Sequence, residues 1–403
     1  MIQIKESRMG RTTDVSVRRK VRRGILVGAA ALIASTVLAS CSLGSGQAGP
    51  PDDGASDGSN DVTVGVVLPF SGAVSRTGNL YRNGVELRLQ EAVDSGELGD
   101  IKVTLQFEDD ANDPNEAVTL ATKFADEGAV ALIGAHSSPV ALAQAATVES
   151  AKMPEFVFGA SNAIENPYQY QVNARDSEQI KNVLNFAEAN GYDTIGLLTD
   201  TGAYGANALT VLQDTIGASD LKIVGSETFE PGASDVTPQL VALRGANPDF
   251  IAMFSFGTPY AAVVQGRAQV GWDIDIVGNV AAGDIAIGEI AGEDATGLYY
   301  MSPLDTSSAE GAKLLAAWQD AYPDAPLTFE GAIAYDTMSV IIRALTEGGT
   351  SRAAVQDWLQ SADAVDGLVS GTIPWDVASR HGLKAGDLSF RVWDKGENHE
   401  AGL

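Results

Sequence analysis

Short apolar runs alternate with amphipathic or Ala-rich stretches along the chain from residue 61. Short apolar runs are typical of buried strands, and longer stretches with helical periodicity are typical of amphipathic helices. The alternation predicts an α/β fold in which parallel sheets carry helices on both faces. A first series of expected strands covers 62–68, 101–107, 129–133 and 155–158, and a second covers 194–199, 222–228, 249–254 and 274–277. Helices are expected between them, among them one over 79–93, and the last third adds strands near 298–301, 372–375 and 388–393.

The expected strand 129–133 is followed by a turn with a distinctive helix start. Ser138 is a candidate N-cap and Pro139 a candidate first helical residue, since Ser accepts from an orphan N–H and Pro lacks one. The next strand ends at the small, polar turn 159–162. Because parallel strands end at one sheet edge, the two turns are expected side by side, where helix N–H groups can hold a carboxylate. The alternative is that Ser138 and Ser161 only cap helices.

The second series repeats this helix start, in which a hydroxyl residue precedes a proline: Thr258 is the expected cap and Pro259 the first helical residue. A further capped helix is expected at Asp113-Pro114. Two lobes of similar plan, each with a capped helix at its sheet edge, favour a ligand cleft between them. Two-lobed proteins of this kind commonly bind small molecules by hinge closure.

Composition narrows the choice of partner and cofactor. The chain has 403 residues, a length that suits two domains, and a formal charge of −27. Because eight of its 26 Lys and Arg residues lie in the first 40 positions, the remainder is strongly acidic, which argues against nucleic acid. One Cys and three His residues offer neither an intramolecular disulfide nor a zinc cluster. No metal or cofactor is expected.

The first 40 residues have the pattern of an export signal. A basic segment precedes the apolar stretch 24–38, which is short for a membrane span, and the chain then reaches Cys41. The sequence around Cys41 resembles a bacterial lipoprotein box, which implies lipidation at Cys41 and a membrane-anchored, extracytoplasmic protein. An ordinary signal peptide or an uncleaved anchor is the alternative. The Gly- and Ser-rich segment 41–60 is expected to be a flexible tether.

Nothing in the sequence forms an enzyme signature. His136 lies two residues from Ser138, but no GxSxG elbow is present, and His136 is more simply a loop residue at the expected cleft. A hydrolase using these two residues is the weakest alternative. The acidic residues at 108–110 and 113 lack the Gly and Glu of a calcium loop, so a solvated loop with a helix cap is expected.

From Asp61 almost to the C-terminus the chain resembles the periplasmic leucine/isoleucine/valine-binding proteins, the type I solute-binding components of ABC importers. The resemblance rests on the order and spacing of VTVGVVLPFSG, DDANDPNEAVTLATKF, ALIGAHSS, FVFGASN, LLTDTGAYGAN, GRAQVGW and AIAYDTM. It implies two Rossmann-like lobes of the type I periplasmic-binding-protein fold, joined by three crossovers near Arg175, Ser302 and Gly371. Lobe one would comprise 61–174 and 303–370, and lobe two 175–302 and 371–403.

The resemblance also implies a ligand site between the lobes. In the family pattern, Ser138 binds the ligand carboxylate, while Gly159, Ala160 and Ser161 form the turn that grips carboxylate and ammonium. Ser137 and His136 would line the first turn, and Tyr204 would close over the ligand from lobe two. Phe256 and Thr77 are looser matches to family aromatic residues.

The ammonium half of an amino-acid site departs from the family pattern. The acidic residue that usually pairs the ammonium aligns with Val280, and Asp284 follows four residues later. A desolvated ammonium without an anion is costly. Either Asp284 substitutes, or the ligand is not an α-amino acid. The resemblance implies a monomeric binding protein that delivers a branched-chain or related amino acid to ABC permease subunits by hinge closure. The alternative is a binder or sensor for a short-chain amide, urea or a small carboxylate.

Overall fold

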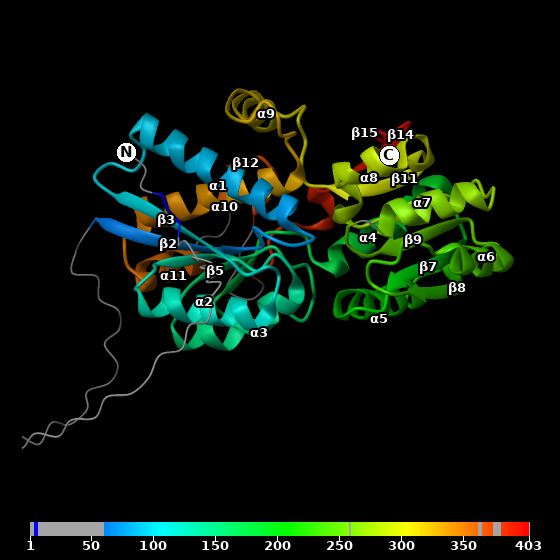
Figure 1. Cartoon of the computed structure of the whole chain (residues 1–403), viewed down its shortest axis with the longest axis horizontal. Helices are drawn as coiled ribbons and strands as arrows, with labels where there is room; N and C mark the ends of the chain where they lie inside the picture. The colour runs from blue at the N-terminus through cyan, green and yellow to red at the C-terminus, as the bar shows by residue number, and fades with distance from the viewer. Residues whose placement is uncertain (1–3, 7–59, 258, 362–364, 374–379, 403) are drawn as a thin grey trace, which may run out of the picture.

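The computed structural model describes residues 4–6, 60–257, 259–361, 365–373 and 380–402. The described chain forms two α/β lobes side by side, with the N-terminal strands in one and the green-to-yellow middle of the chain in the other (Figure 1). Buried apolar residues of both lobes, from Val64 in the first sheet to Phe250 in the second, belong to one continuous cluster. The lobes are therefore in direct contact in this structure.

The sheet of the first lobe has six parallel strands in the order β1-β3-β2-β4-β5-β6. The strands are β1 (Ile4–Glu6), β2 (Asp61–Leu68), β3 (Lys102–Asp109), β4 (Ala131–Gly134), β5 (Glu155–Val157) and β6 (Gln169–Gln171). β1 lies inside the segment predicted as an export signal and aligns parallel to β3. The central strand β4 is buried along its whole length, as its continuous apolar run predicts.

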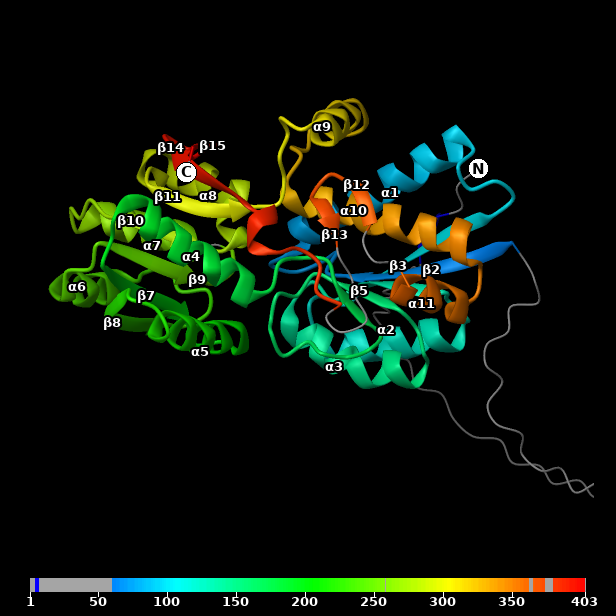
Figure 2. The same cartoon turned by 180° about the vertical axis from the view of Figure 1, so that it is seen from behind.

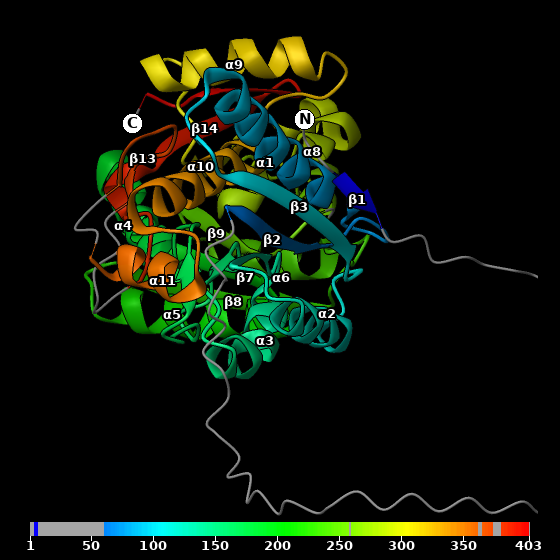
Figure 3. The same ribbon diagram turned by 90° about the vertical axis from the view of Figure 1, so that its left-hand side faces the viewer.

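Helices cover both faces of this sheet, as the end-on view in Figure 3 shows. They are α1 (Ser75–Ser95) and α10 (Phe329–Arg343), which pack against each other, α2 (Pro114–Asp126) and α3 (Ser138–Ser150), which form a second pair, and α11 (Arg352–Ser361). α10 continues into a π-helical turn, η3 (Ala344–Gly348), and the hairpin β12 (Val365–Leu368) and β13 (Gly371–Ile373) follows α11. Helix α9 (Ala309–Ala321) stands apart from both sheets (Figure 1).

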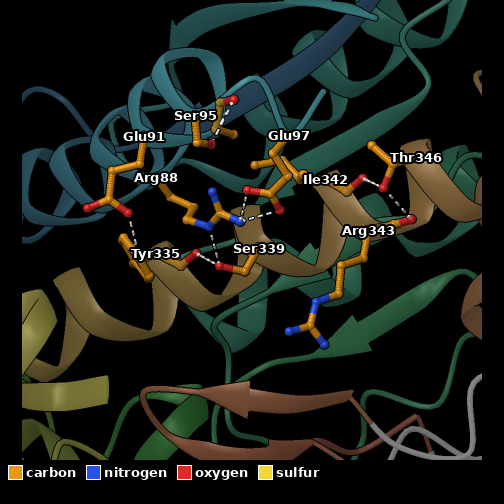
Figure 4. Close-up of polar contacts among 10 residues, drawn as sticks. Arg88, Glu91, Ser95, Glu97, Tyr335, Ser339, Ile342, Arg343 and Thr346 are labelled. Carbon is orange, nitrogen blue, oxygen red and sulfur yellow. Dashed lines mark hydrogen bonds and ion pairs between the residues drawn. The ribbon is translucent and has the colours of Figure 1, made fainter. Parts of the chain in front are cut away.

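Polar side chains tie α10 to α1 across their apolar contact (Figure 4). The Arg88 guanidinium donates to Ser339 Oγ at 2.9 Å and to Glu97 Oε1 at 2.6 Å, and the Tyr335 hydroxyl donates to Glu91. Because Tyr335 and Ser339 lie four residues apart on one face of α10, their two bonds fix the rotation of α10 against α1. The N-terminus of α10 is thereby held at the junction between the lobes.

The sheet of the second lobe has seven strands in the order β15-β14-β11-β10-β9-β7-β8. β14 pairs antiparallel with both of its neighbours, β11 and β15. The strands are β7 (Thr194–Asp200), β8 (Lys222–Phe229), β9 (Phe250–Phe254), β10 (Asp275–Gly278), β11 (Leu298–Ser302), β14 (Ser389–Asp394) and β15 (Glu397–Glu400). The helices are α4 (Asp176–Asn190), α5 (Ala203–Gly217), α6 (Thr237–Ala246), α7 (Pro259–Gln269) and α8 (Ile285–Ala291), with 3-10 turns η1 (Val280–Gly283), η2 (Gly292–Ala295) and η4 (Ala385–Asp387). The sequence thus builds each lobe from the predicted strand–helix repeat.

The chain passes between the sheets where β6 leads to α4 and where β11 leads to α9 (Figure 2). Gly371 begins β13, inside the hairpin with β12, and the chain rejoins the second sheet only at β14. The domain limits beyond these observations remain a prediction.

The starts of α1 and α3 differ from the expectations. α1 begins at Ser75, four residues before the predicted start. Residues 75–78 form its first turn, and no side chain caps this turn. α3 begins at Ser138 itself, so that Ser137 rather than Ser138 is the N-cap residue, and Pro139 occupies the second helical position. The cap expected at Thr258 lies outside the described residues, although α7 does begin at Pro259. The cap at Asp113 is confirmed, since its carboxylate accepts from the N–H groups of residues 115 and 116.

Candidate functional site

The turn after β4 brings three candidate residues to the edge of the first sheet. Ala135 has a φ of 54°, in the left-handed region, which bends the chain sharply before His136. Ser137 is extended, and its hydroxyl donates to Asn112 Oδ1 at 2.7 Å, which links the turn to the loop after β3. Ser138 then begins α3, a helix of 13 residues whose first N–H groups face this edge.

The turn after β5 lies directly against the start of α3. The backbone N–H of Ser161 donates to Ser138 Oγ at 3.1 Å. A Cβ on Gly159 would lie 2.9 Å from both Cα and N of Ser138, so only glycine permits this approach. The Gln171 side chain donates to the carbonyls of Gly159 and Ser161 at 2.9 and 3.1 Å. The two turns are therefore side by side, with Ala160 buried between them.

The hydroxyl groups of Ser138 and Ser161 each accept a hydrogen bond and retain a proton to donate. Ser138 Oγ accepts from Ser161 N–H, and Ser161 Oγ accepts from Ala163 N–H at 3.2 Å. Neither hydroxyl donates a bond to any acceptor in the described part of the chain. Ser138 and Ser161 are 2% and 3% exposed. Two buried O–H donors beside a helix N-terminus suit an anionic group.

The alternative that Ser161 only caps a helix does not fit the structure. Its hydroxyl bonds the N–H two residues ahead within a turn, and the next helix, α4, begins only at Asp176. Ser138 does not cap α3 either, since it lies inside the helix and its hydroxyl accepts from the neighbouring turn. Helix capping therefore does not explain the placement of the two serines.

A buried carboxyl group holds the two strands beneath these turns. Gln169 Nε2 donates to Glu155 Oε2 at 2.7 Å and to the Ala141 carbonyl of α3 at 2.6 Å. Glu155 is fully buried, and burial raises its pKa to about 8. A neutral carboxyl group at physiological pH thus joins β5, β6 and α3.

Aromatic side chains of the second lobe face the first turn. Phe256 follows β9, and its ring centroid lies 6.3 Å from that of His136 and 4.2 Å from that of Tyr204. His136 also lies 5.9 Å from Tyr81 of α1, which stacks on Phe158 at 4.0 Å. Tyr204 and Phe256 are thus brought to the junction between the lobes, opposite the serine turns.

The hydroxyl of Tyr204 is already hydrogen-bonded within the second lobe. It donates to Asp176 Oδ1 at 2.9 Å and accepts from Asn279 Nδ2 at 2.7 Å. Burial raises the pKa of Asp176 to about 7, and the Asp176 N–H donates to the Ala160 carbonyl at 2.8 Å. Tyr204 therefore presents its ring rather than its hydroxyl. Sequence reasoning missed Asp176 and Asn279, although Asn279 directly follows a buried strand, where site residues gather.

His136 is placed as an aromatic wall of this junction. Burial lowers its pKa to about 4, so the imidazole is neutral near pH 7. Its Nδ1 is buried and has no hydrogen-bond partner among the described residues, and no bond joins it to Ser138. The Ser138–His136 pair thus lacks the geometry of an activated nucleophile.

The remaining candidates do not converge on the serine turns. Thr77 is half-buried in the first turn of α1. Asp284 uses its carboxylate to cap α8, accepting from the Ala286 N–H at 2.9 Å. Val280 is 3% exposed, and its N–H donates to Gln179 Oε1 at 3.0 Å. No acidic group therefore occupies the position at which Val280 aligns with the family's ammonium partner.

An ion pair between Arg76 and Glu289 joins the two lobes near these residues. Arg76 of α1 donates to Glu289 of α8 at 3.1 and 3.4 Å, and both side chains are substantially exposed. A two-point contact of this kind holds the lobes in their observed arrangement, although solvent screening limits its strength.

The structure bears less directly on the predictions about metal binding, the membrane and lipidation. Within the described residues no cluster of three His, Cys, Asp or Glu side chains could hold a metal, and Asp109 instead accepts from the N–H groups of residues 70, 71 and 111. None of the helices that the structure describes has the length and apolar character needed to cross a bilayer. Cys41, the tether residues 41–59 and all of the signal segment except residues 4–6 lie outside the described residues, so lipidation remains a prediction.

Comparison with known proteins supports the same architecture. Residues 61–398 match the sequence profile of the family described as periplasmic binding protein. The Leu/Ile/Val-binding protein homolog 3 of Brucella melitensis is 22% identical over 356 residues, which cover 84% of this chain and 92% of that protein.

Two solved structures are similar along nearly their whole length. The branched-chain amino acid transporter substrate-binding protein LivJ of Streptococcus pneumoniae, in complex with isoleucine, matches with a TM-score of 0.76 and 21% identity, covering 84% of this chain and 98% of LivJ. A solute-binding protein of an ABC transporter from Rhodopseudomonas palustris, in complex with 3,4-dihydroxybenzoic acid, matches with a TM-score of 0.74 and 21% identity, covering 85% and 96%. At this identity the two structures share the fold with this chain, and they hold chemically different ligands.

Proposed function

The chain belongs to the periplasmic binding protein family, and from this premise we propose that it is the lipid-anchored, extracytoplasmic substrate-binding component of an ABC importer. Members of this family bind solutes and are not enzymes, and the described site has no activated nucleophile. The proposed solute is a branched-chain or related amino acid, or another small molecule with a carboxylate. The proposed partners are ABC permease subunits, with the membrane reached through a lipid at Cys41.

The observation that carries the proposal is the contact between the turns at Ser138 and Ser161. Their hydroxyl groups accept from backbone N–H groups and can each donate to a carboxylate, at the N-terminus of a 13-residue helix. In the proposed open form this edge is accessible. Closure would bring Tyr204 and Phe256 over the bound solute, and in the observed arrangement the Phe256 ring already lies near both His136 and Tyr204.

A ligand without an ammonium group is the second candidate, and Val280 favours it. An α-amino acid needs an anion or several acceptors for its ammonium, and Val280 provides only a backbone N–H that is already bonded. Asp284 is the nearest acidic substitute along the chain, but its carboxylate caps α8. The 3,4-dihydroxybenzoate held by the Rhodopseudomonas palustris protein is a carboxylate of this kind. A short-chain amide or urea would leave the two hydroxyl donors without an anion.

A thermal-shift panel tests the proposal and separates the candidates. A solute that binds only the folded protein raises its Tm. We expect Tm to rise with leucine, isoleucine or valine if the amino-acid proposal holds, and with 4-methylpentanoate or 3,4-dihydroxybenzoate if the ammonium is not recognised. No response to any carboxylate, with a response to acetamide or urea, would overturn the proposed ligand class.

The serine turns are tested by the double variant Ser138→Ala with Ser161→Ala. We expect at least tenfold weaker binding of the responding solute, because each lost bond to a charged group is worth about 1.5–3 kcal/mol. Ser150→Ala, at the exposed end of the same helix α3, is the matched control and should bind as the wild type does. Unchanged affinity of the double variant in calorimetry, with the fold intact, would remove these residues from the site.

A further inference from the structure

His136 holds an unpaired nitrogen at the junction between the lobes. Its Nδ1 is buried and has no hydrogen-bond partner among the described residues, although the residue as a whole is partly exposed. The imidazole lies near Tyr81 of the first lobe and Phe256 of the second, with ring centroids 5.9 and 6.3 Å away. Separation of the lobes would withdraw Phe256 from the imidazole, and closure would bury the imidazole again, against a bound solute.

The electrostatic surroundings of His136 favour a neutral partner. Among the described residues, burial alone lowers the pKa of His136, and no acidic or basic neighbour contributes. The nearby Glu330 contributes instead to the raised pKa of the Tyr81 hydroxyl. A neutral imidazole carries one N–H donor and one nitrogen acceptor. Without an anion beside it, the imidazole suits a hydroxyl group, which can both donate and accept, better than an ammonium group.

The polar side chains around Tyr204 in the second lobe are already engaged. The Tyr204 hydroxyl is bonded to Asp176 and Asn279. The Gln179 side chain accepts from the Val280 N–H at 3.0 Å and donates to a backbone carbonyl at 2.8 Å. A second polar group on the solute would therefore compete with existing bonds here, whereas the imidazole of the first lobe offers a nitrogen that no group occupies.

Aromatic rings from both lobes surround this nitrogen. In the first lobe Tyr81 stacks on Phe158, with centroids 4.0 Å and planes 9° apart. In the second lobe Tyr204 lies 4.2 Å from Phe256. His136 connects the two pairs, so that neighbouring rings run from one lobe to the other. Such rings pack well on a further aromatic ring, in offset-stacked or edge-to-face contacts at centroid distances of about 4.5–7 Å.

We propose that the solute is a hydroxylated aromatic carboxylate, whose ring hydroxyl pairs with the imidazole of His136 while its carboxylate binds at the serine turns. This inference rests on the proposed function, because it assumes a carboxylate at Ser138 and Ser161. The bond to the hydroxyl recovers the free energy that a buried, unpaired nitrogen costs. A solute of this class has no ammonium group, so it needs no acidic residue at the position of Val280.

Benzoate, 3-hydroxybenzoate and 4-hydroxybenzoate are the probes, titrated into the full chain by calorimetry. We expect one of the hydroxybenzoates to bind the wild type about tenfold more tightly than benzoate, because it gains a hydrogen bond to a buried group. His136→Phe keeps an aromatic ring and removes both nitrogens. In this variant the advantage of the hydroxyl should fall below about twofold, while benzoate binds at least as well as it binds the wild type.

The ratio of the two affinities separates a hydrogen bond from a structural role of His136. A general disturbance of the junction would weaken benzoate and hydroxybenzoate alike and leave their ratio unchanged. His399→Phe, the same substitution at an exposed position of β15, is the matched control and should keep the wild-type ratio. The comparison of the probes on the wild type does not depend on the folding of any variant.

The inference is overturned if neither hydroxybenzoate binds the wild type at least about fivefold more tightly than benzoate, or if His136→Phe keeps the advantage. It is also overturned if leucine, isoleucine or valine binds more tightly than both hydroxybenzoates, a result that would leave the proposed function intact. The proposed function fails, and the inference with it, if the variant Ser138→Ala with Ser161→Ala binds each carboxylate as the wild type does.

Discussion

The buried carboxyl group of Glu155 makes this protein less stable as the pH rises. Glu155 is fully buried in β5, and its neighbour Gln169 is an amide that donates a bond at 2.7 Å without bringing a charge. Burial raises the pKa of Glu155 from 4.5 in the unfolded chain to about 8. The folded state therefore holds a proton that the unfolded state releases, and the stabilisation is complete below pH 4.5 and lost as the pH rises through 8.

The magnitude follows from the same two pKa values. Between pH 5 and pH 9 this one group should remove about 4 kcal/mol from the free energy of unfolding, as an order-of-magnitude upper value. Glu155→Gln keeps an oxygen that can accept from Gln169 and removes the titration. We expect the variant to match the wild type at pH 5 and to be more stable by several kcal/mol at pH 9.

Urea denaturation at pH 5, 7 and 9 measures the effect. Other buried carboxyl groups also titrate, so the informative quantity is the difference between wild type and Glu155→Gln at each pH. Glu188→Gln, an exposed change on α4, is the control and should show no such difference. Parallel stability curves for wild type and Glu155→Gln would refute the assignment of a buried, protonated carboxyl group at this position.

Three further predictions concern the site and its supports. Gly159→Ala places a Cβ 2.9 Å from Ser138 Cα and should cost about 1–3 kcal/mol in urea denaturation while weakening solute binding; a wild-type affinity would contradict the close packing of the turns. Arg76→Gln breaks the exposed pair with Glu289, so calorimetry should show about threefold weaker binding or less, with no difference at 1 M salt; a loss above tenfold would contradict this modest role. Arg352→Met leaves the carbonyls of Ala125 and Ala129 without their guanidinium donor at 2.5 and 2.6 Å, and should cost about 2–4 kcal/mol; a cost below 0.5 kcal/mol would contradict it.

The strands of both lobes could be predicted because their signal is local. A run such as 129–133 is apolar at every position, and β4 is buried throughout, so hydrophobic pattern and tertiary structure agree. Strand β15 (Glu397–Glu400) could not be found this way, since it is polar and exposed and is defined only by its pairing with β14. Helix α1 starts early for a similar reason: Ser75, Thr77 and Gly78 have weak helix preference, and the tertiary structure decides their conformation.

In the candidate site, too, contacts between the ends of neighbouring strands could be predicted, and contacts made by tertiary packing could not. The turn at Ser138 and the turn at Ser161 could be predicted to meet, because consecutive parallel strands end at one edge. The network of Asp176, Tyr204 and Asn279 could not, because its members are brought together from α4, α5 and the end of β10 by the packing of the second lobe. Thr328 also looks like an ordinary helix cap in the sequence, and only the structure shows that its side chain caps no N–H of α10.

The proposed function requires that the serine turns hold the carboxylate of the solute. Isothermal titration of the solute that raises Tm most, beside its uncharged carboxamide analogue, tests this claim directly. We expect the carboxamide to bind at least about a hundredfold more weakly, because two hydrogen bonds to a charged group are each worth about 1.5–3 kcal/mol. Equal affinity for the acid and its carboxamide would contradict the claim.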